Sequence, residues 1–382
     1  MNRGLARLTT ALLLAGTAPA LAQEEVKIID TVELSGPGAP SGLNWQKGAD
    51  MAVAEINAAG GILGRKIALS HLDNQSNAGV AKSVVAKAID EEPYVIIGPI
   101  FSGDVMVTMA GVDQAQIPQI MGGEAAPLTK QGYHYTFRTS LSQAAGLPPL
   151  AAHFANEVKL KSIAVVWVNS DYGRDSQDVM LPALAKHDIK VLADISTEQG
   201  QLDFSNVAVA IIKSNADAVF AYLNEEESAR LLTELKKQGY DKPRYGETVL
   251  ISAKVIQLAG AAANGAIGHV GLSANVPNPL VKAFAEKYKK AYGFETDHNG
   301  IKGYYAIYLV KTITEKIGKF DRKLFADSLR GARLSTKSYP GLLVDTAYDA
   351  TGDVDRESYM VEVKDGKQVI FRTLPPLSGA IE

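Results

Sequence analysis

Cysteine is absent from this sequence of 382 residues. That absence excludes disulfide bridges and thiolate metal sites, and it also excludes a lipid anchor on a cysteine at a cleavage point. A large exported domain can fold without disulfides, because its hydrophobic core is big enough to carry its stability. We therefore expect the fold to be held together by its core and not by covalent cross-links.

The sequence also has little net charge, with 39 Lys and Arg against 42 Asp and Glu. A nucleic-acid partner would call for a concentrated basic face, and the sequence shows no such concentration. We therefore expect no nucleic-acid partner.

Patterns that would carry catalysis or bind a cofactor are missing as well. The sequence has neither the phosphate-binding pattern G-x-x-x-x-G-K-[ST] nor the nucleophile pattern G-x-S-x-G. The glycine-rich run from Gly36 to Gly42 lacks the last glycine of a dinucleotide-binding loop, and its two prolines remove backbone donors. The six histidines show no metal-ligand spacing. We expect no catalytic residue, no cofactor and no metal, and therefore not an enzyme.

Long apolar runs are lacking except at the amino terminus. There, two arginines precede the apolar stretch Leu8–Ala18, and Ala20-Leu21-Ala22 follows as a small-x-small cleavage pattern. The stretch is much shorter than the ~20 residues that a membrane span needs. Residues 1–22 are therefore predicted to be a signal peptide, so that the mature chain starts near Gln23 in the periplasm without a lipid anchor. The remaining length is enough for two domains.

The mature chain alternates short β-rich runs with longer stretches of helical period. Strands are predicted at Val26–Val32, Lys66–Leu72, Tyr94–Ile97, Gln119–Met121, Ser162–Val168, Lys190–Ile195 and Ala218–Tyr222. Helices are predicted at Trp45–Ala58, Ala78–Asp90, Asp104–Gln116, Leu147–Glu157, Tyr172–His187, Phe204–Ser214 and Glu225–Gln238. This repeated alternation predicts an α/β fold with parallel sheets that are flanked by helices on both faces.

The pattern changes after about residue 270, where helices become more frequent than strands. Helices are predicted at Pro279–Tyr292, Gly300–Lys316 and Asp321–Leu329, and strands at Tyr339–Val344 and Tyr359–Val363. The polar run from Asp349 to Asp353 predicts a turn between the last strands. No low-complexity linker marks a domain boundary, which is consistent with a chain that crosses repeatedly between two lobes.

Short motifs in a fixed order point to a known family. They are Leu34-Ser35-Gly36-Pro37, the segment 54–65, Asp73-Asn74, Ile97-Gly98-Pro99, Ile117-Pro118, Asp171-Tyr172-Gly173, Phe204-Ser205 and the segment 235–240. With these motifs the chain resembles the periplasmic solute-binding proteins of ABC transporters, of the branched-chain amino acid (Leu/Ile/Val-binding) type. The resemblance covers almost the whole mature chain.

The resemblance implies the type I periplasmic binding fold, with two Rossmann-like lobes joined by a three-strand hinge. Lobe 1 would comprise residues 23–141 and 273–345, and lobe 2 residues 142–272 and 346–382. The implied function is a receptor that binds an aliphatic or aromatic amino acid between the lobes and delivers it, as a monomer, to an inner-membrane permease. Two alternatives remain open: an aromatic or other small carboxylate that lacks the amine, and a sensory module of the same fold.

Ligands of parallel α/β sheets collect beyond the carboxyl ends of the strands, and the loop after the predicted strand Tyr94–Ile97 has such a position. The Ser102 hydroxyl and the backbone N–H groups that follow it, including that of Gly103, could bind a carboxylate without any cation. Ser102 could alternatively be only a helix N-cap. Phe101 could supply an apolar wall.

A second loop of this kind follows the predicted strand Gln119–Met121 and contains Gly123, Glu124 and Ala125. Glycine lets a backbone approach a ligand closely, and in the resembling proteins the backbone of this loop contacts the ligand. Glu124 departs from the small residues usual there. It could pair with a ligand ammonium group or be a solvated loop charge.

The remaining candidates come mostly from the second lobe. The resemblance places Tyr172 over the ligand, although it could instead pack against the sheet. Asn224 lies on a further loop, and Glu247 and Thr248 lie near the position where the family often carries an amine-binding carboxylate. Because Thr248 aligns with that carboxylate, the α-amino site stays open. From lobe 1, Ser41 and Trp45 lie on the first loop and helix and could line the mouth of the lobe, although Trp45 could be a core residue.

Overall fold

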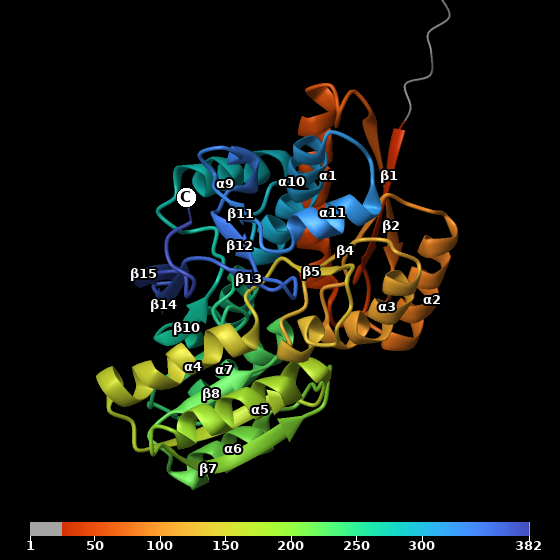
Figure 1. Cartoon of the computed structure of the whole chain (residues 1–382). Coiled ribbons are helices and arrows are strands. Elements are labelled where there is room, and N and C mark those ends of the chain that lie inside the picture. The colour runs from red at the N-terminus through yellow and green to blue at the C-terminus, as the bar shows by residue number, and fades with distance from the viewer. Residues whose placement is uncertain (1–24, 382) are drawn as a thin grey trace, which may run out of the picture.

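The computed structural model describes residues 25–381, and Figure 1 shows that they form two α/β lobes. The predicted signal peptide, residues 1–22, lies outside the described residues. The red and orange segments and the blue helices make up the first lobe, and the yellow and green segments make up most of the second. The predicted fold class, parallel sheets flanked by helices, is confirmed.

The first lobe is built on a parallel five-stranded sheet of order β2-β1-β3-β4-β5. Its strands are β1 (Glu25–Val32), β2 (Lys66–Asp73), β3 (Val95–Ile97), β4 (Gln119–Met121) and β5 (Thr136–Arg138). The helices of this lobe are α1 (Ala39–Ala58), α2 (Ala78–Asp90), α3 (Ser102–Gln114), α9 (Pro279–Tyr292), α10 (His298–Ile317) and α11 (Arg322–Leu329). Strand β3 is buried along its whole length, as expected for a central strand of a covered parallel sheet.

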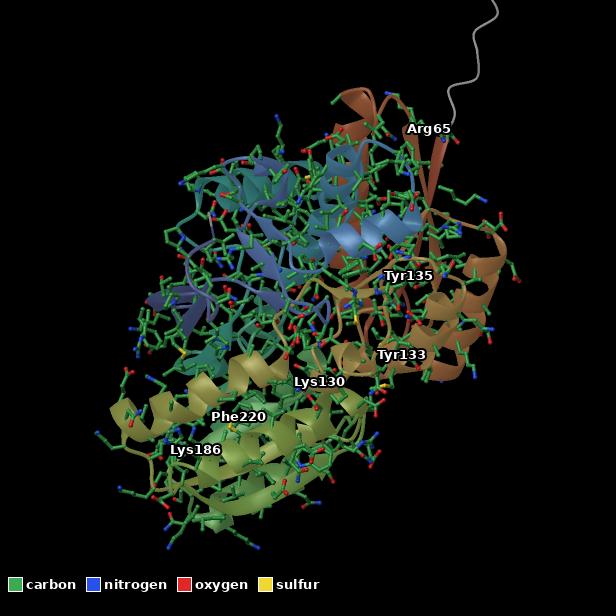
Figure 2. All side chains as sticks on the ribbon, in the orientation of Figure 1. Arg65, Lys130, Tyr133, Tyr135, Lys186 and Phe220 are labelled. Carbon is green, nitrogen blue, oxygen red and sulfur yellow. The ribbon has the colours of Figure 1, made fainter. Side chains whose placement is uncertain are left out.

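The second lobe is built on a seven-stranded sheet of order β15-β14-β10-β9-β8-β6-β7. Its strands are β6 (Ser162–Val168), β7 (Lys190–Thr197), β8 (Val219–Tyr222), β9 (Arg244–Glu247), β10 (Ala266–Val270), β14 (Ser358–Lys364) and β15 (Lys367–Leu374). Its helices are α4 (Gln143–His153), α5 (Asp171–Ala185), α6 (Ser205–Ser214), α7 (Glu225–Lys237) and α8 (Ala253–Ala259), and the π-helical turn η2 (Phe154–Val158) continues α4. Side chains fill the space between these layers, and Phe220 of β8 lies wholly inside the lobe (Figure 2).

A small third sheet lies where the chain passes between the lobes. It contains β11 (Arg333–Leu334), β12 (Thr346–Tyr348) and β13 (Val354–Asp355). Short 3-10 turns complete the fold: η1 (Ala126–Thr129), η3 (Gly260–Ala262) and η4 (Pro340–Leu342). The chain crosses after β5, after β10 and after β13, and an isolated bridge between Leu141 and Val354 joins the first crossing to the third.

Helices α1 and α10 are packed backbone against backbone, and glycines make this possible. A Cβ on Gly48 would stand 2.0 Å from the carbonyl oxygen of Gly300, and a Cβ on Gly303 would stand 2.1 Å from that of Trp45. No side chain fits at such distances. The two helices bring the start of α1, with Ser41, beside the start of α10.

Several elements differ from the sequence-based prediction. The strand predicted at Tyr339–Val344 is wrong, because Pro340 lacks an N–H and the chain forms the turn η4 instead. Helix α1 begins at Ala39, six residues earlier than predicted, because Pro40 is tolerated in the first turn of a helix. Strands β5, β9, β10 and β15 were not predicted at all. No helix among residues 25–381 is both long and apolar enough to cross a bilayer.

Substituting Gly303→Ala should force α1 and α10 apart. We expect the free energy of unfolding to fall by ~1–3 kcal/mol, as for other overpacked positions, although alanine favours a helix by ~1 kcal/mol over glycine. The control is Gly111→Ala in α3, where the nearest atom would stand 3.5 Å from the new Cβ. Urea unfolding followed by circular dichroism should show a lower midpoint for Gly303→Ala only. Equal midpoints for the two variants would contradict the close helix contact.

Candidate ligand-binding cleft

A cavity between the two lobes brings together loops that follow the carboxyl ends of strands in both sheets. Its volume is about 40 Å³. The lining residues from the first lobe are Ser41, Ile100, Phe101, Ser102, Gly122, Glu124, His298, Asn299 and Lys302. Those from the second lobe are Tyr172, Asn224, Glu225 and Val249. We refer to this cavity as the cleft.

A smaller cavity adjoins the cleft on the side of the hinge. Glu124, His298 and Lys302 line both of them, so the two spaces share one wall. Glu247 and Thr248 line only the smaller space. These two predicted residues therefore lie near the cleft but behind its charged wall.

Ser102 is the first residue of α3, and its hydroxyl is oriented by the neighbouring loop. The hydroxyl oxygen accepts hydrogen bonds from the backbone N–H groups of Glu124 and Ala125, both at 3.2 Å. Because both bonds use its lone pairs, the hydroxyl proton is available for an acceptor in the cleft. The N-cap position belongs to Phe101, and no side chain caps the helix, so the N-cap alternative for Ser102 is wrong.

A buried carboxylate holds the loop before α3 in place. Glu33, at the end of β1, accepts hydrogen bonds from the backbone N–H groups of Ile100 and Phe101, at 3.1 and 2.9 Å. Burial raises the pKa of Glu33. Burial and the neighbouring Glu33 carboxyl raise the pKa of Asp104 to about 8, so Asp104 is protonated at neutral pH.

The cleft contains one buried lysine, and its partner is Glu124. The ammonium of Lys302 lies 2.8 Å from a carboxylate oxygen of Glu124, and the two side chains are 3% and 12% exposed. Glu124 is therefore not a solvated loop charge. Its carboxylate is already paired with a cation inside the protein. The structure therefore does not support the alternative in which Glu124 pairs with a ligand ammonium group.

Glu225 joins the lobes across the cleft. It is the first residue of α7, it is buried, and it accepts a hydrogen bond of 2.5 Å from the hydroxyl of Ser41 on α1. Burial raises the pKa of Glu225, while the Ser41 bond and the charge of Lys302 oppose that rise. Glu225 forms no ion pair with any residue between 25 and 381. It is a buried carboxylate without a cation of its own.

Glu247, whose contact with a ligand amine was left open, has a partner inside the protein. It ends β9, and its carboxylate lies 3.1 Å from Nδ1 of His269 on β10. Burial raises the pKa of Glu247, and the hydrogen bond to His269 opposes the rise. The side chain is thereby turned toward the sheet of the second lobe.

Tyr172 and Asn299 complete the wall. The ring of Tyr172 lies 4.3 Å from that of Tyr222, and Tyr172 lines the cleft from the second lobe as predicted, with the sheet residue Tyr222 behind it. The buried side-chain amide of Asn299 has no hydrogen-bond partner within the described part of the chain. Because buried amides are nearly always satisfied, this one is available to a polar group of a ligand. Burial lowers the pKa of His298 well below its usual value, so that side chain is neutral.

Besides Glu247 and Thr248, four more of the predicted site residues do not line the cleft. Trp45 is fully buried and donates its indole N–H to Asp30, so it is a core residue. Gly123 and Ala125 lie behind the cleft wall, where their carbonyl oxygens accept hydrogen bonds from Arg138. Gly103 faces Asp171 of the opposite lobe.

The residues that sequence reasoning missed come mostly from α10. His298, Asn299 and Lys302 are polar residues at the start of a helix whose remaining length is mainly buried and apolar. That unusual polarity on a buried helix was the available signal. The ion pair of Lys302 with Glu124 could not be predicted, because more than 170 residues separate the two along the chain.

A family model described as periplasmic binding protein matches residues 25–368. The chain belongs to the periplasmic binding protein family. Within that family it is of type I and of the branched-chain amino acid kind. The family consists of solute-binding receptors of ABC importers and not of enzymes. Its members are located in the periplasm or outside the cell.

Three similar proteins illustrate the range of ligands. A leucine-, isoleucine-, valine-, threonine- and alanine-binding protein of Pseudomonas aeruginosa is 26% identical over 94% of this chain and 95% of its own. A Streptococcus pneumoniae branched-chain amino acid binding protein, solved with isoleucine, is 24% identical with a TM-score of 0.82 over 92% of this chain and 99% of its own. An R. palustris solute-binding protein, solved with benzoate, is 21% identical with a TM-score of 0.84 over 92% of this chain and 97% of its own.

Asp297, which caps α10 next to the cleft, should give a measurable pH dependence. Burial and the negative charge of Glu225 raise its pKa from 3.8 to about 7. At pH values between 3.8 and about 7, Asp297 keeps its proton in the folded chain but has released it in the unfolded chain. The free energy of unfolding therefore falls as the pH rises through this range.

The variant Asp297→Asn keeps a capping oxygen but cannot titrate. We expect the variant to gain stability over wild type as the pH rises from about 4 to about 7, and the difference to be constant above that. Urea unfolding of both proteins at a series of pH values measures this difference in stability. Parallel pH profiles would show that Asp297 does not titrate as described.

Proposed function

We propose that the cleft binds an amino acid with an aliphatic or aromatic side chain, for delivery to an ABC permease. The observation that carries this proposal is the buried carboxylate of Glu225, which forms no ion pair within residues 25–381 and lies in the wall of the cleft. A ligand ammonium group would supply the missing charge. A ligand without an amine would leave Glu225 buried and unpaired, which is costly.

The other groups fit the rest of an α-amino acid. The Ser102 hydroxyl and the N–H groups in the first turn of α3 would bind the carboxylate, because a helix N-terminus favours an anion. Tyr172, Phe101 and Val249 would surround the side chain. The cleft is small, which favours a ligand of the size of a single amino acid over a peptide.

A small aromatic carboxylate without the amine is the second candidate. It is favoured by the similarity to the benzoate-binding protein of R. palustris and by the aromatic pair of Tyr172 and Tyr222 beside the cleft. In that case Glu225 would have to be protonated, which its raised pKa makes easier. A sensory module of the same fold would have the same cleft and would differ only in its partner.

We also propose that the chain reaches the periplasm through cleavage of residues 1–22, carries no lipid anchor and acts as a monomer. The support is the sequence pattern around Ala20-Leu21-Ala22 and the absence of cysteine. Mass spectrometry of the exported protein would test the first two statements.

A thermal-shift screen of single amino acids against aromatic carboxylates tests the ligand class. A true ligand at ~100 times its Kd should stabilise the fold by ~2.7 kcal/mol. We expect at least one amino acid to raise the melting temperature more than any benzoate does. If benzoates shift the melt and no amino acid does, the amino-acid proposal is wrong.

Ser102→Ala should weaken binding of the ligand found in that screen. Losing a hydrogen bond to a carboxylate costs ~1–3 kcal/mol, and isothermal titration calorimetry measures the loss. Thr108→Ala serves as control, because Thr108 lies on the same helix and its hydroxyl bonds to the backbone of Val105 and to Gln119, away from the cleft. Unchanged affinity in Ser102→Ala would remove this residue from the site.

A further inference from the structure

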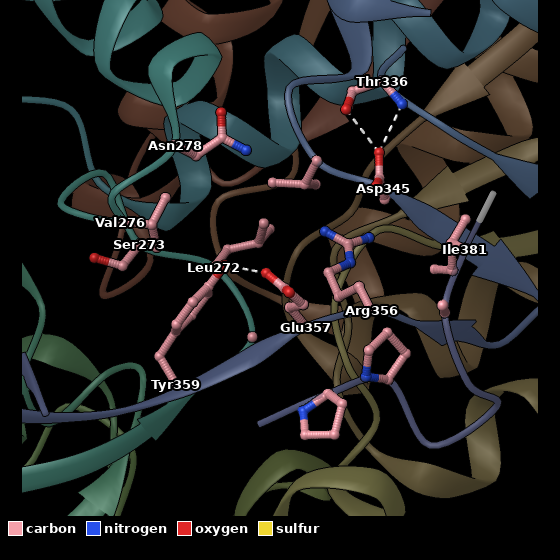
Figure 3. A pocket seen from close by; sticks show the side chains of 15 residues that line it. Leu272, Ser273, Val276, Asn278, Thr336, Asp345, Arg356, Glu357, Tyr359 and Ile381 are labelled. Carbon is pink, nitrogen blue, oxygen red and sulfur yellow. Dashed lines mark hydrogen bonds between the residues drawn. The ribbon is translucent and has the colours of Figure 1, made fainter. Parts of the chain in front are cut away.

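A second cavity, of about 320 Å³, lies behind the hinge (Figure 3). Its walls come from the crossing after β10, the loop before β12, the crossing after β13 and the C-terminal segment. Gly271 and Leu272 line both this cavity and the small space beside Glu247. One stretch of chain therefore separates the second cavity from the cleft, and none of the cleft-lining residues belongs to it.

Arg356 is a buried cation in this second cavity without a counter-ion. The residue is 2% exposed, and none of its three guanidinium nitrogens has a hydrogen-bond acceptor among residues 25–381. The guanidinium lies over the ring of Tyr305, whose centroid is 5.2 Å away. A guanidinium stays protonated in proteins. Burying it unpaired is costly, so an anion is needed.

The two acidic residues of this cavity do not meet that need. Asp345 accepts two hydrogen bonds of 2.6 Å from the backbone and hydroxyl of Thr336, and Glu357 accepts one of 3.2 Å from the hydroxyl of Tyr359. Neither forms an ion pair with Arg356 in the described chain. Figure 3 shows the guanidinium between them, pointing into the pocket. Their charges disfavour an anion of more than one negative charge.

Apolar walls of the second cavity come from Leu272, Val276, Val344 and Ile381, and further polar groups come from Ser273, Asn278 and Thr336. We propose that this cavity is a second ligand site, which binds a small organic monocarboxylate through the guanidinium of Arg356. The planar fork of arginine matches the two oxygens of a carboxylate. The apolar walls take the hydrocarbon part of the ligand. The volume leaves room for a chain of a few carbons.

Equilibrium dialysis of the exported chain with labelled butyrate tests the proposal. We expect wild type to bind butyrate, Arg356→Met to bind it at least about tenfold more weakly, a loss of the size of one charged hydrogen bond, and Arg356→Lys to be intermediate. The matched control is Arg372→Met, an exposed arginine on β15 that pairs with Glu157. This control variant should bind butyrate as tightly as wild type does.

The proposal is overturned if wild type binds no butyrate or if Arg356→Met binds it normally. Inorganic phosphate that competes more strongly than butyrate would overturn the assignment to a monocarboxylate.

Two further measurements distinguish ligand binding by Arg356 from a merely structural role. Without carboxylate, Arg356→Met should melt at the same temperature as wild type or higher, because an unpaired buried charge is replaced by an apolar side chain. Crystals of wild type soaked with 3-bromopropionate should show anomalous bromine density beside Arg356. Density in the cleft alone, or none at all, would contradict the proposal even if the variant failed to fold.

Discussion

Buried charge is the constraint on which the cleft depends. Lys302 and Glu124 form an ion pair inside the protein, whereas Glu225 is buried, accepts a hydrogen bond from Ser41 and forms no ion pair in the described chain. A protein tolerates such a group when a ligand supplies the opposite charge. On the proposed function, the carboxylate of Glu225 would select a ligand that carries an ammonium group.

The packing of α1 against α10 makes this arrangement possible. Glycines at the crossing let the two backbones touch, and this brings Ser41 of one helix near Asn299 and Lys302 of the other. The hydrogen bond from Ser41 to Glu225 then links the first lobe to the second. The cleft is therefore lined by both lobes, and the hydrogen bond from Ser41 to Glu225 spans it.

Most of the fold could be predicted from the sequence, because buried parallel strands and their helices have strong periodic signals. Helices Ala78–Asp90 and Pro279–Tyr292 and strand Ser162–Val168 have the predicted bounds. Edge and hinge strands such as β5 and β15 could not be predicted. Strand β5 is only three residues long, and β15 is half exposed, so neither has a long apolar run.

The site could be predicted only in part. Loops after strands can be recognised by their position in the sequence, and this identified the cleft residues Ser102, Phe101, Glu124, Asn224 and Ser41. Tyr172 was identified through the family resemblance. Which charge pairs with which is set by tertiary contacts over long sequence distances. Local reasoning therefore left the partner of Glu124 open and missed Lys302. It also overlooked Glu225 as a site residue, because the acidic start of α7 is equally typical of an ordinary helix N-terminus.

The most direct test of this account compares an amino acid with its analogue that lacks only the amine. Leucine and 4-methylpentanoate would be titrated into wild type and Glu225→Gln by calorimetry. Wild type should prefer leucine by at least about tenfold, since a charged hydrogen bond contributes ~1.5–3 kcal/mol. The variant should lose most of that preference. Equal affinity of wild type for the two compounds, or an undiminished preference in Glu225→Gln, would contradict the central role of the buried carboxylate.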